Sequence, residues 1–142
     1  MTYLADTSAV WRLLRRRVGD PWPGYLAQGL IALCPPVESE LMAGVRGERD
    51  FASFETILKT AFTWYPALDD PWPKILSVQR ELVKIGHHRG PSPLDILIAL
   101  TAQHHRLTLI HLDDDFASIA KVRPGIAMTR LEEVPQPPVE AR

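Results

Sequence analysis

Short apolar runs alternate with amphipathic stretches along the whole chain. Residues 3–6, 30–34, 107–110 and 125–131 have the composition of strands, and residues 62–68 are compatible with a further short strand. The segments between them carry apolar side chains at helical spacing. Strands that alternate with helices form a parallel sheet covered by helices on both faces. The pattern therefore predicts an α/β fold: a three-layer α/β/α domain with a central parallel sheet of four to five strands.

Helices are expected between these strands. The first follows residues 3–6, with Thr7 or Ser8 as its cap, and Ser92 is the expected cap of a helix that begins near Pro93. The apolar spacing predicts the others after Pro36 and over residues 51–62, 71–85 and 116–121. Within residues 71–85 we expect four side chains to be buried: Ile75, Leu76, Leu82 and Val83. Residues 19–29 are punctuated by proline and glycine and predict a connecting stretch.

Composition and charge limit the class of protein. A chain of 142 residues, 46% hydrophobic and 23% charged, fits one domain, which we place at residues 1–131, with a flexible tail at 132–142. The net charge of −1 means that attraction to nucleic acid must come from a local patch. The single cysteine excludes an internal disulfide, and no apolar stretch is long enough to span a membrane. We expect a cytoplasmic protein without a signal peptide.

Four carboxylates stand at the edges of apolar runs: Asp6, Glu40, Asp95 and Asp113. Asp6 and Asp113 follow strands, and sites in open α/β sheets form at the carboxyl ends of strands. Each acid alone has an ordinary explanation as a cap, a turn residue or a solvated helix residue. Together in one pocket they would repel one another, and a hard divalent cation would relieve that repulsion. The pattern predicts a metal site capable of phosphodiester hydrolysis.

Two assignments remain open at this stage. Glu38 competes with Glu40, because residues two apart on a helix point in different directions; we favour Glu40, which precedes Leu41 on the apolar stripe. Four arginines crowd the end of the first helix, and Arg12, Arg15 and Arg16 are our candidates for contact with nucleic-acid phosphate. A solvated helix end with favourable dipole interactions explains the same arginines equally well.

The four acidic blocks together resemble the PIN-domain family, specifically VapC-type toxins of type II toxin–antitoxin systems. The resemblance covers nearly the whole chain in the family's order and is carried by residues 4–9, 40–44, 95–99 and 111–116. It implies a magnesium- or manganese-dependent endoribonuclease that acts on RNA, is held inactive by a cognate VapB-type antitoxin and forms a homodimer.

The resemblance also implies roles for individual residues. The family's acidic quartet falls on Asp6, Glu40, Asp95 and Asp113, and the metal ligands among Asp6, Asp95, Asp113 and the further acid Asp115. Thr7 and Ser8 match small hydroxyl residues that position a carboxylate or a metal-bound water. His111 departs from the pattern, because many relatives have Thr or Ser two residues before the fourth acid.

Other functions fit the sequence less well. A PIN-like module that binds RNA or protein without cleaving it is the main alternative, and retention of all four acids counts against it. A phosphatase with two aspartates spaced by one residue would need an acid at position 8, where this chain has Ser8.

Overall fold

A five-stranded parallel sheet forms the centre of the molecule, as the sequence predicts. The computed structural model describes residues 1–132. The strands lie in the order β3-β2-β1-β4-β5. They are β1 (Tyr3–Ala5), β2 (Ile31–Leu33), β3 (Thr63–Trp64), β4 (Thr108–His111) and β5 (Met128–Arg130), and all neighbouring pairs are parallel. The predicted α/β fold class is confirmed.

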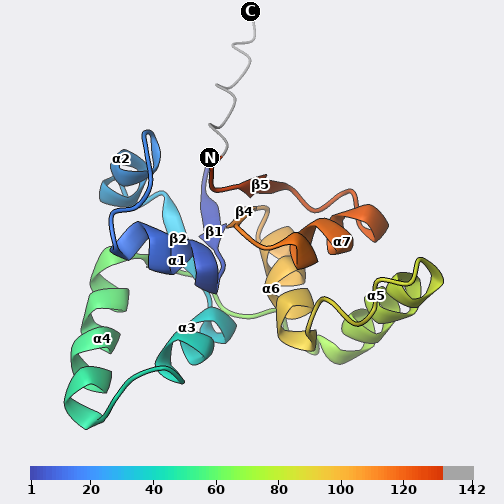
Figure 1. The fold of residues 1–142 in the computed structure, drawn as a ribbon, viewed down its shortest axis with the longest axis horizontal. Helices are drawn as coiled ribbons and strands as arrows, with labels where there is room; N and C mark the ends of the chain where they lie inside the picture. Colours follow the sequence, from blue (N-terminus) through green and yellow to red (C-terminus); the bar gives the residue numbers. More distant parts are fainter. Residues whose placement is uncertain (133–142) are drawn as a thin grey trace, which may run out of the picture.

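Helices flank the sheet in two groups (Figure 1). The helices that connect β1 to β2 and β2 to β3 are α1 (Thr7–Leu14), α2 (Trp22–Ala27), α3 (Pro35–Met42) and α4 (Glu48–Ala61). Those that follow β3 are α5 (Trp72–Lys84), α6 (Pro93–His104) and α7 (Asp114–Val122). Figure 1 shows the first four helices on one side of β1 and β4 and the last three on the other, so the sheet is enclosed between two helical layers.

The strand order reverses between β1 and β4. From β1 the chain moves outward through β2 to β3, then crosses back to place β4 on the opposite side of β1 and β5 beyond it. Ala5 of β1 pairs with Ile110 of β4, and the backbone N–H of Asp6 donates to the carbonyl of Ile110 at 3.1 Å. In open α/β sheets such a reversal opens a crevice at the carboxyl ends of the two strands. The residues that follow β1 and β4 therefore meet at one place.

The central strands are buried on both faces. Every residue of β1 and β2 is buried, which explains why these segments read as continuous apolar runs and not as alternating ones. Trp22 at the start of α2 is also buried and packs edge-on against the ring of Tyr3, with centroids 5.1 Å apart. This packing holds the start of β1 beneath α2.

Three local predictions were wrong. Residues 19–29 are not merely a connection, because they contain α2. Asp6, and not Thr7 or Ser8, caps α1. Leu76 and Val83 are 61% and 55% exposed, because the buried stripe of α5 is narrower than expected and consists of Ile75, Val78 and Leu82.

Two further expectations concern the C-terminal tail and membrane-spanning segments. Apart from Glu132, the tail predicted at 132–142 lies outside the described residues. In the part of the chain that the structure describes, no helix combines the length and the apolar character needed to cross a bilayer.

Candidate active site

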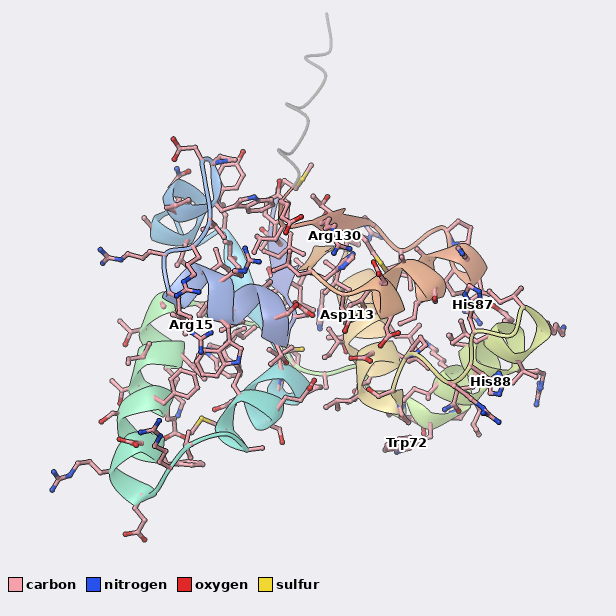
Figure 2. The ribbon with its side chains drawn as sticks, in the orientation of Figure 1. Arg15, Trp72, His87, His88, Asp113 and Arg130 are labelled. Carbon is pink, nitrogen blue, oxygen red and sulfur yellow. The ribbon has the colours of Figure 1, made fainter. Side chains whose placement is uncertain are left out.

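All four predicted carboxylates line one pocket at the reversal point between β1 and β4. The pocket, which we call the acidic pocket, has a volume of about 300 Å³. Its lining residues are Asp6, Thr7, Ser8, Trp11, Glu40, Asp95, Ile98 and Asp113. They come from the end of β1, α1, α3, α6 and the turn after β4. Figure 2 shows Asp113 near the middle of the molecule, between the two helical groups. The structure thus brings together acids that lie more than a hundred residues apart.

Asp6 is the most buried acid of the pocket, with 4% of its surface exposed. Its Oδ1 accepts a hydrogen bond from the N–H of Ala9 at 2.8 Å, which caps α1, and the Ser8 hydroxyl donates to Oδ1 and Oδ2 at 2.8 and 2.9 Å. Burial raises the pKa of Asp6 to about 6; these hydrogen bonds oppose the rise, and the nearby charge of Asp113 adds to it. The carboxylate is therefore held in place but is short of positive charge.

Asp95 is fixed at the start of α6 by a capping box. Its Oδ2 accepts from the N–H of Ser92 at 2.9 Å, and its own N–H donates to the Ser92 hydroxyl at 3.1 Å. Pro93 at the first helical position suits this geometry. The reciprocal bonds hold the half-buried Asp95 side chain at the rim of the acidic pocket.

The turn after β4 sends its three consecutive aspartates in different directions. Asp113 caps α7, and its Oδ1 accepts from the N–H of Asp115 at 2.9 Å. Asp114 forms an ion pair with Arg130 at 3.0 Å. The Arg130 guanidinium also donates to the carbonyl of Leu112 at 3.2 Å, which braces the turn. Only Asp113 of the three lines the acidic pocket.

Asp115 lies outside the acidic pocket but within its electric field. Burial, followed by the charges of Asp113, Asp95 and Asp114, raises the pKa of Asp115. Its Oδ1 lies beside Gly90, so close that a Cβ added to that glycine would be 2.5 Å from this oxygen. The loop before α6 therefore packs directly against a carboxylate that shares the field of the pocket.

His111, the residue that departs from the family pattern, stabilises the turn after β4 that carries Asp113. It is buried, and its Nδ1 accepts a hydrogen bond from the N–H of Asp113 at 3.3 Å. Its ring also contacts Phe116, with centroids 5.2 Å apart. The imidazole thus holds the Asp113 backbone at a position where a hydroxyl residue was expected.

Glu40, and not Glu38, lines the acidic pocket. The residue as a whole is exposed, but partial desolvation of its carboxylate raises its pKa, the charge of Asp95 raises it further, and the Thr7 hydroxyl opposes the rise. The Thr7 Oγ1 is buried and makes no hydrogen bond of standard geometry within residues 1–132. We attribute its influence on Glu40 to proximity without a well-formed bond.

The acids form one electrostatic network, although they do not yet enclose a metal position. The charge of Asp113 contributes to the raised pKa of Asp6, and the charge of Asp95 contributes to that of Glu40. The charges of Asp113 and Asp95 both contribute to the raised pKa of Asp115. Across the described residues, no group of three or more His, Cys, Asp or Glu side chains is placed so that it could hold a metal ion as it stands. The possible ligands that line the pocket are carboxylates and hydroxyls, which is the donor set that hard divalent cations prefer.

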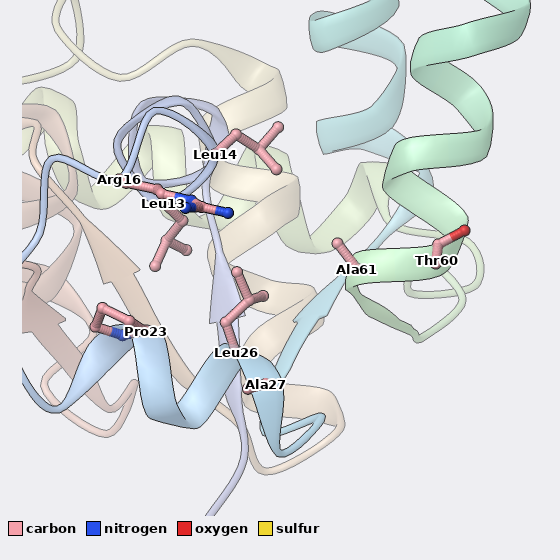
Figure 3. A pocket seen from close by; sticks show the side chains of 8 residues that line it. All are labelled: Leu13, Leu14, Arg16, Pro23, Leu26, Ala27, Thr60 and Ala61. Carbon is pink, nitrogen blue, oxygen red and sulfur yellow. The ribbon is translucent and has the colours of Figure 1, made fainter.

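The arginines of the first helix separate onto two surfaces. Arg12 and Arg15 line a second pocket, next to the acidic pocket, together with Arg17. Arg16 instead lines a pocket of about 620 Å³ between α1, α2 and the end of α4 (Figure 3). Of the three predicted RNA-binding arginines, two therefore lie beside the acids and one does not.

The sequence analysis missed two residues that line the acidic pocket, Ile98 and Trp11. The Trp11 side chain is half-buried and lines both the acidic pocket and the pocket of Arg12 and Arg15. The signal was present in the spacing: Ser8, Trp11 and Arg15 follow one another at three and four residues, which places them on one side of a helix.

Comparisons with known proteins agree on the family. A family profile described as the PIN domain matches residues 3–122. Among curated proteins of Mycobacterium tuberculosis, ribonuclease VapC17 is 35% identical over 135 residues, covering 92% of this chain and 96% of the relative, and ribonuclease VapC21 is 29% identical over 120 residues, covering 84% and 87%. A DNA-bound VapBC structure from Salmonella typhimurium superposes with a TM-score of 0.70 at 16% identity over 92% of this chain and 98% of that one. VapBC2 from Rickettsia felis gives 0.67 at 19% identity, with the same coverage. The chain therefore belongs to the PIN-domain family, and its relatives within that family are VapC-type toxins.

Proposed function

We propose that this chain is a magnesium- or manganese-dependent endoribonuclease, and that it is the toxin of a toxin–antitoxin pair. The single observation that carries the proposal is the acidic pocket, in which four separate elements present Asp6, Glu40, Asp95 and Asp113 to one hollow. The similarity to curated ribonucleases named VapC supports an RNA substrate. Such a substrate also implies action in the cytoplasm of a bacterial cell.

The residues of the pocket fit a hard divalent cation. Buried Asp6 has a pKa of about 6, so a neighbouring positive charge would stabilise its ionised form. The Thr7 hydroxyl is buried without a hydrogen-bond partner in the described chain and could accept one from a metal-bound water. Since the acids line the pocket without enclosing a metal position, magnesium suits it, because this ion normally keeps several of its waters.

Each residue has a defined part in the proposed reaction. Asp6, Asp95 and Asp113 would hold the cation, with Asp115 as a further acid nearby. When bound, the cation supplies a water of lowered pKa and neutralises charge that develops on the phosphate. Ser8 keeps the Asp6 carboxylate oriented through its two hydrogen bonds, and Glu40 contributes an additional negative group at the rim.

The test is cleavage of RNA with and without metal. We expect wild-type protein to cut RNA internally when magnesium or manganese is present and to stop when EDTA is added. Asp6→Asn should abolish cleavage while retaining the fold, because asparagine also caps helices. Asp69→Asn, an exposed aspartate outside the acidic pocket, is the matched control. Cleavage unaffected by Asp6→Asn would refute the assigned site, and RNA binding without cleavage would favour the alternative of a non-cleaving module.

The proposed antitoxin partner also has a candidate surface. The pocket of about 620 Å³ that contains Arg16 is lined mainly by apolar side chains of α1, α2 and α4, including Leu13, Leu14 and Leu26 (Figure 3). The VapBC complexes that resemble this fold motivate the choice of a VapB-type peptide as its occupant. An amphipathic peptide helix would bury this apolar lining. Leu26→Asp should weaken capture of the antitoxin encoded beside this chain, without loss of RNA cleavage.

A homodimer is the second assembly that we propose. Four large apolar side chains at α5 and its end are 43% to 62% exposed: Trp72, Leu76, Val83 and Ile85. Covering them against a second copy would remove this apolar surface from water. Light scattering should give twice the monomer mass for the wild type and a monomer mass for Leu76→Asp.

A further inference from the structure

A second pocket adjoins the acidic pocket along α1. It has a volume of about 260 Å³, and we call it the arginine pocket. Its lining residues are Ser8, Trp11, Arg12, Arg15, Arg17 and Leu112. Ser8 and Trp11 line both pockets, so these two residues lie between the carboxylates of one pocket and the guanidinium groups of the other. An extended ligand bound in the acidic pocket could reach the arginine pocket without leaving this surface.

The arginine pocket has the charge that a phosphate requires. Three of its lining residues are arginines and none is acidic. The next hollow along the surface also contains Arg12 and Arg17, but Asp20 and Glu132 line it as well, and these acids would repel a phosphate. Arg12 contacts Glu132 only at 4.0 Å, and both side chains are about half exposed, so this pair is weak and replaceable. A nucleic-acid strand with one phosphate at the acidic pocket should therefore place a neighbouring phosphate in the arginine pocket and not in the next hollow.

The turn after α1 explains why Arg17, and not Arg16, joins Arg12. Arg16 has a φ of 55°, in the left-handed region, which reverses the chain. The N–H of Arg17 consequently donates back to the carbonyl of Arg12 at 3.0 Å. The reversal leaves Arg16 on the apolar pocket between α1, α2 and α4.

Trp11 holds the arginine pocket to the helical core. Its ring stacks on Phe54 of α4, with centroids 5.4 Å apart and an interplanar angle of 8°. The guanidinium carbon of Arg15 lies 5.0 Å from the Trp11 centroid, in cation–π contact. An indole fixed by Phe54 therefore restricts where the exposed Arg15 side chain can go.

From this geometry we propose that the arginine pocket binds the phosphate adjacent to the one that is cut, and that Trp11 is a positioning residue that holds Arg15 for this contact. The proposal rests on the proposed function, because it takes the acidic pocket as the place of cleavage. It defines the substrate as an RNA strand with at least two consecutive phosphates.

The experiment removes the charge of one phosphate at a time. The cut in a defined oligoribonucleotide is mapped first, and a neutral methylphosphonate then replaces the phosphate on either side of it. With wild-type protein we expect one of the two replacements to lower kcat/KM about tenfold, the value of one charge-assisted hydrogen-bonded contact. The side on which this occurs gives the direction of the strand.

The same substrates are then given to the Arg15→Ala/Arg17→Ala double variant. We expect its kcat/KM to be reduced on the normal substrate, with no further loss on the methylphosphonate, because protein and substrate changes remove the same contact. Arg80→Ala, an exposed arginine on α5, controls for the loss of one charge. Arg16→Ala should cost far less than Arg15→Ala. Independent, multiplying losses, or equal effects at Arg15 and Arg16, would overturn the proposal.

Trp11 is tested by its conservative variant. Trp11→Phe retains an aromatic ring and should keep the dependence on the adjacent phosphate, whereas Trp11→Leu should lose that dependence while still cleaving the substrate. A Trp11→Leu variant that remains sensitive to the methylphosphonate would remove Trp11 from the proposal.

A failure of the proposed function can be told apart from a failure of this inference. If wild-type protein cuts no RNA, fluorescence anisotropy with the same oligonucleotides and Asp6→Asn protein still tests the pocket. Adding Arg15→Ala and Arg17→Ala should weaken binding at least tenfold and reduce the slope of log K against log salt by about 0.7 for each lost contact. Binding equal to that of the Arg80→Ala control would refute the pocket as a phosphate site.

Discussion

The hydroxyl of Ser8 donates to both carboxylate oxygens of Asp6, at 2.8 Å to Oδ1 and 2.9 Å to Oδ2. Together with the N–H of Ala9, this places three hydrogen-bond contacts on a side chain that has lost nearly all contact with water. The contacts favour the ionised form, whereas burial favours the protonated form, and burial prevails. The ionised form of Asp6 is therefore destabilised in the folded protein, and a bound cation would stabilise it.

That balance predicts how stability depends on pH. Asp6 has a pKa of about 6 in the folded protein against 3.8 in the unfolded chain, so the folded state is penalised as pH rises from about 4 through 6. The full penalty, present above pH 6, is at most about 3 kcal/mol. Without metal, Asp6→Asn should therefore be more stable than wild type at pH 8, by about 1–3 kcal/mol, and the difference should vanish near pH 4.

Urea denaturation in EDTA at the two pH values measures this difference. Asp69→Asn is the control, since that aspartate is exposed and lies outside the acidic pocket. A destabilised Asp6→Asn protein at pH 8 would show that its charge is already compensated. Manganese should stabilise wild-type protein at pH 8, where the penalty is greatest, and should stabilise Asp6→Asn much less.

Removing the Ser8 hydroxyl should move the Asp6 titration further from its ordinary value. The hydrogen bonding of the Ser8 hydroxyl lowers the pKa of Asp6, so Ser8→Ala should raise the titration midpoint above the present value of about 6. Ser8→Thr, which keeps a hydroxyl, should restore it. The carboxyl carbon resonance of Asp6, followed by NMR against pH, gives the midpoint directly. An unchanged midpoint in Ser8→Ala would mean that the backbone N–H groups of Ala9 and residue 8 oppose the effect of burial without help from the hydroxyl.

The sequence predicted the strands and the acids because both are local signals. Buried parallel strands are short apolar runs, and an acid directly after such a run lies at the edge of the sheet wherever the strand is placed. The strand order is a different matter, since nothing near Asp6 or Asp113 states that β1 and β4 are neighbours. Their meeting at a reversal point became visible only in three dimensions.

Other misses have equally specific causes. Helix α2 has six residues, with Pro23 near its start and Gly24 next to it, so its local composition resembles a turn. Apolar spacing in α5 identified a stripe but not its edges, which is why Leu76 and Val83 were expected inside. Arg16 and Arg17 line different pockets because Arg16 adopts a left-handed backbone conformation. Arginine, unlike glycine, does not indicate that conformation in a sequence.

The choice between two neighbouring glutamates gives a direct mutational comparison. Glu40 lines the acidic pocket, and the charge of Asp95 helps to raise its pKa, whereas Glu38 does not line the pocket. Glu40→Gln should therefore reduce metal-dependent RNA cleavage about 10- to 100-fold, the range typical of groups that support a metal site. Glu38→Gln, two residues away on the same helix, should stay within twofold of wild type. Equal losses in the two variants would point to a general effect on α3 and not to the pocket.

The contact between Gly90 and Asp115 tests the role of the fifth acid without changing any charge. A Cβ at position 90 would lie 2.5 Å from Oδ1 and 3.4 Å from Cγ of Asp115, so Gly90→Ala must displace that carboxylate. The displaced group is the end of a flexible side chain, and the loss of stability should stay below about 1 kcal/mol. Manganese affinity, measured by calorimetry, should nevertheless fall if Asp115 contributes to the site. Gly125→Ala, where the new atom meets only an ordinary 3.6 Å contact, is the matched control.

In an Asp115→Asn background, Gly90→Ala should have no further effect on manganese affinity, because both changes act on the same carboxylate. Additive losses would mean that the loop at Gly90 acts on the metal by another route.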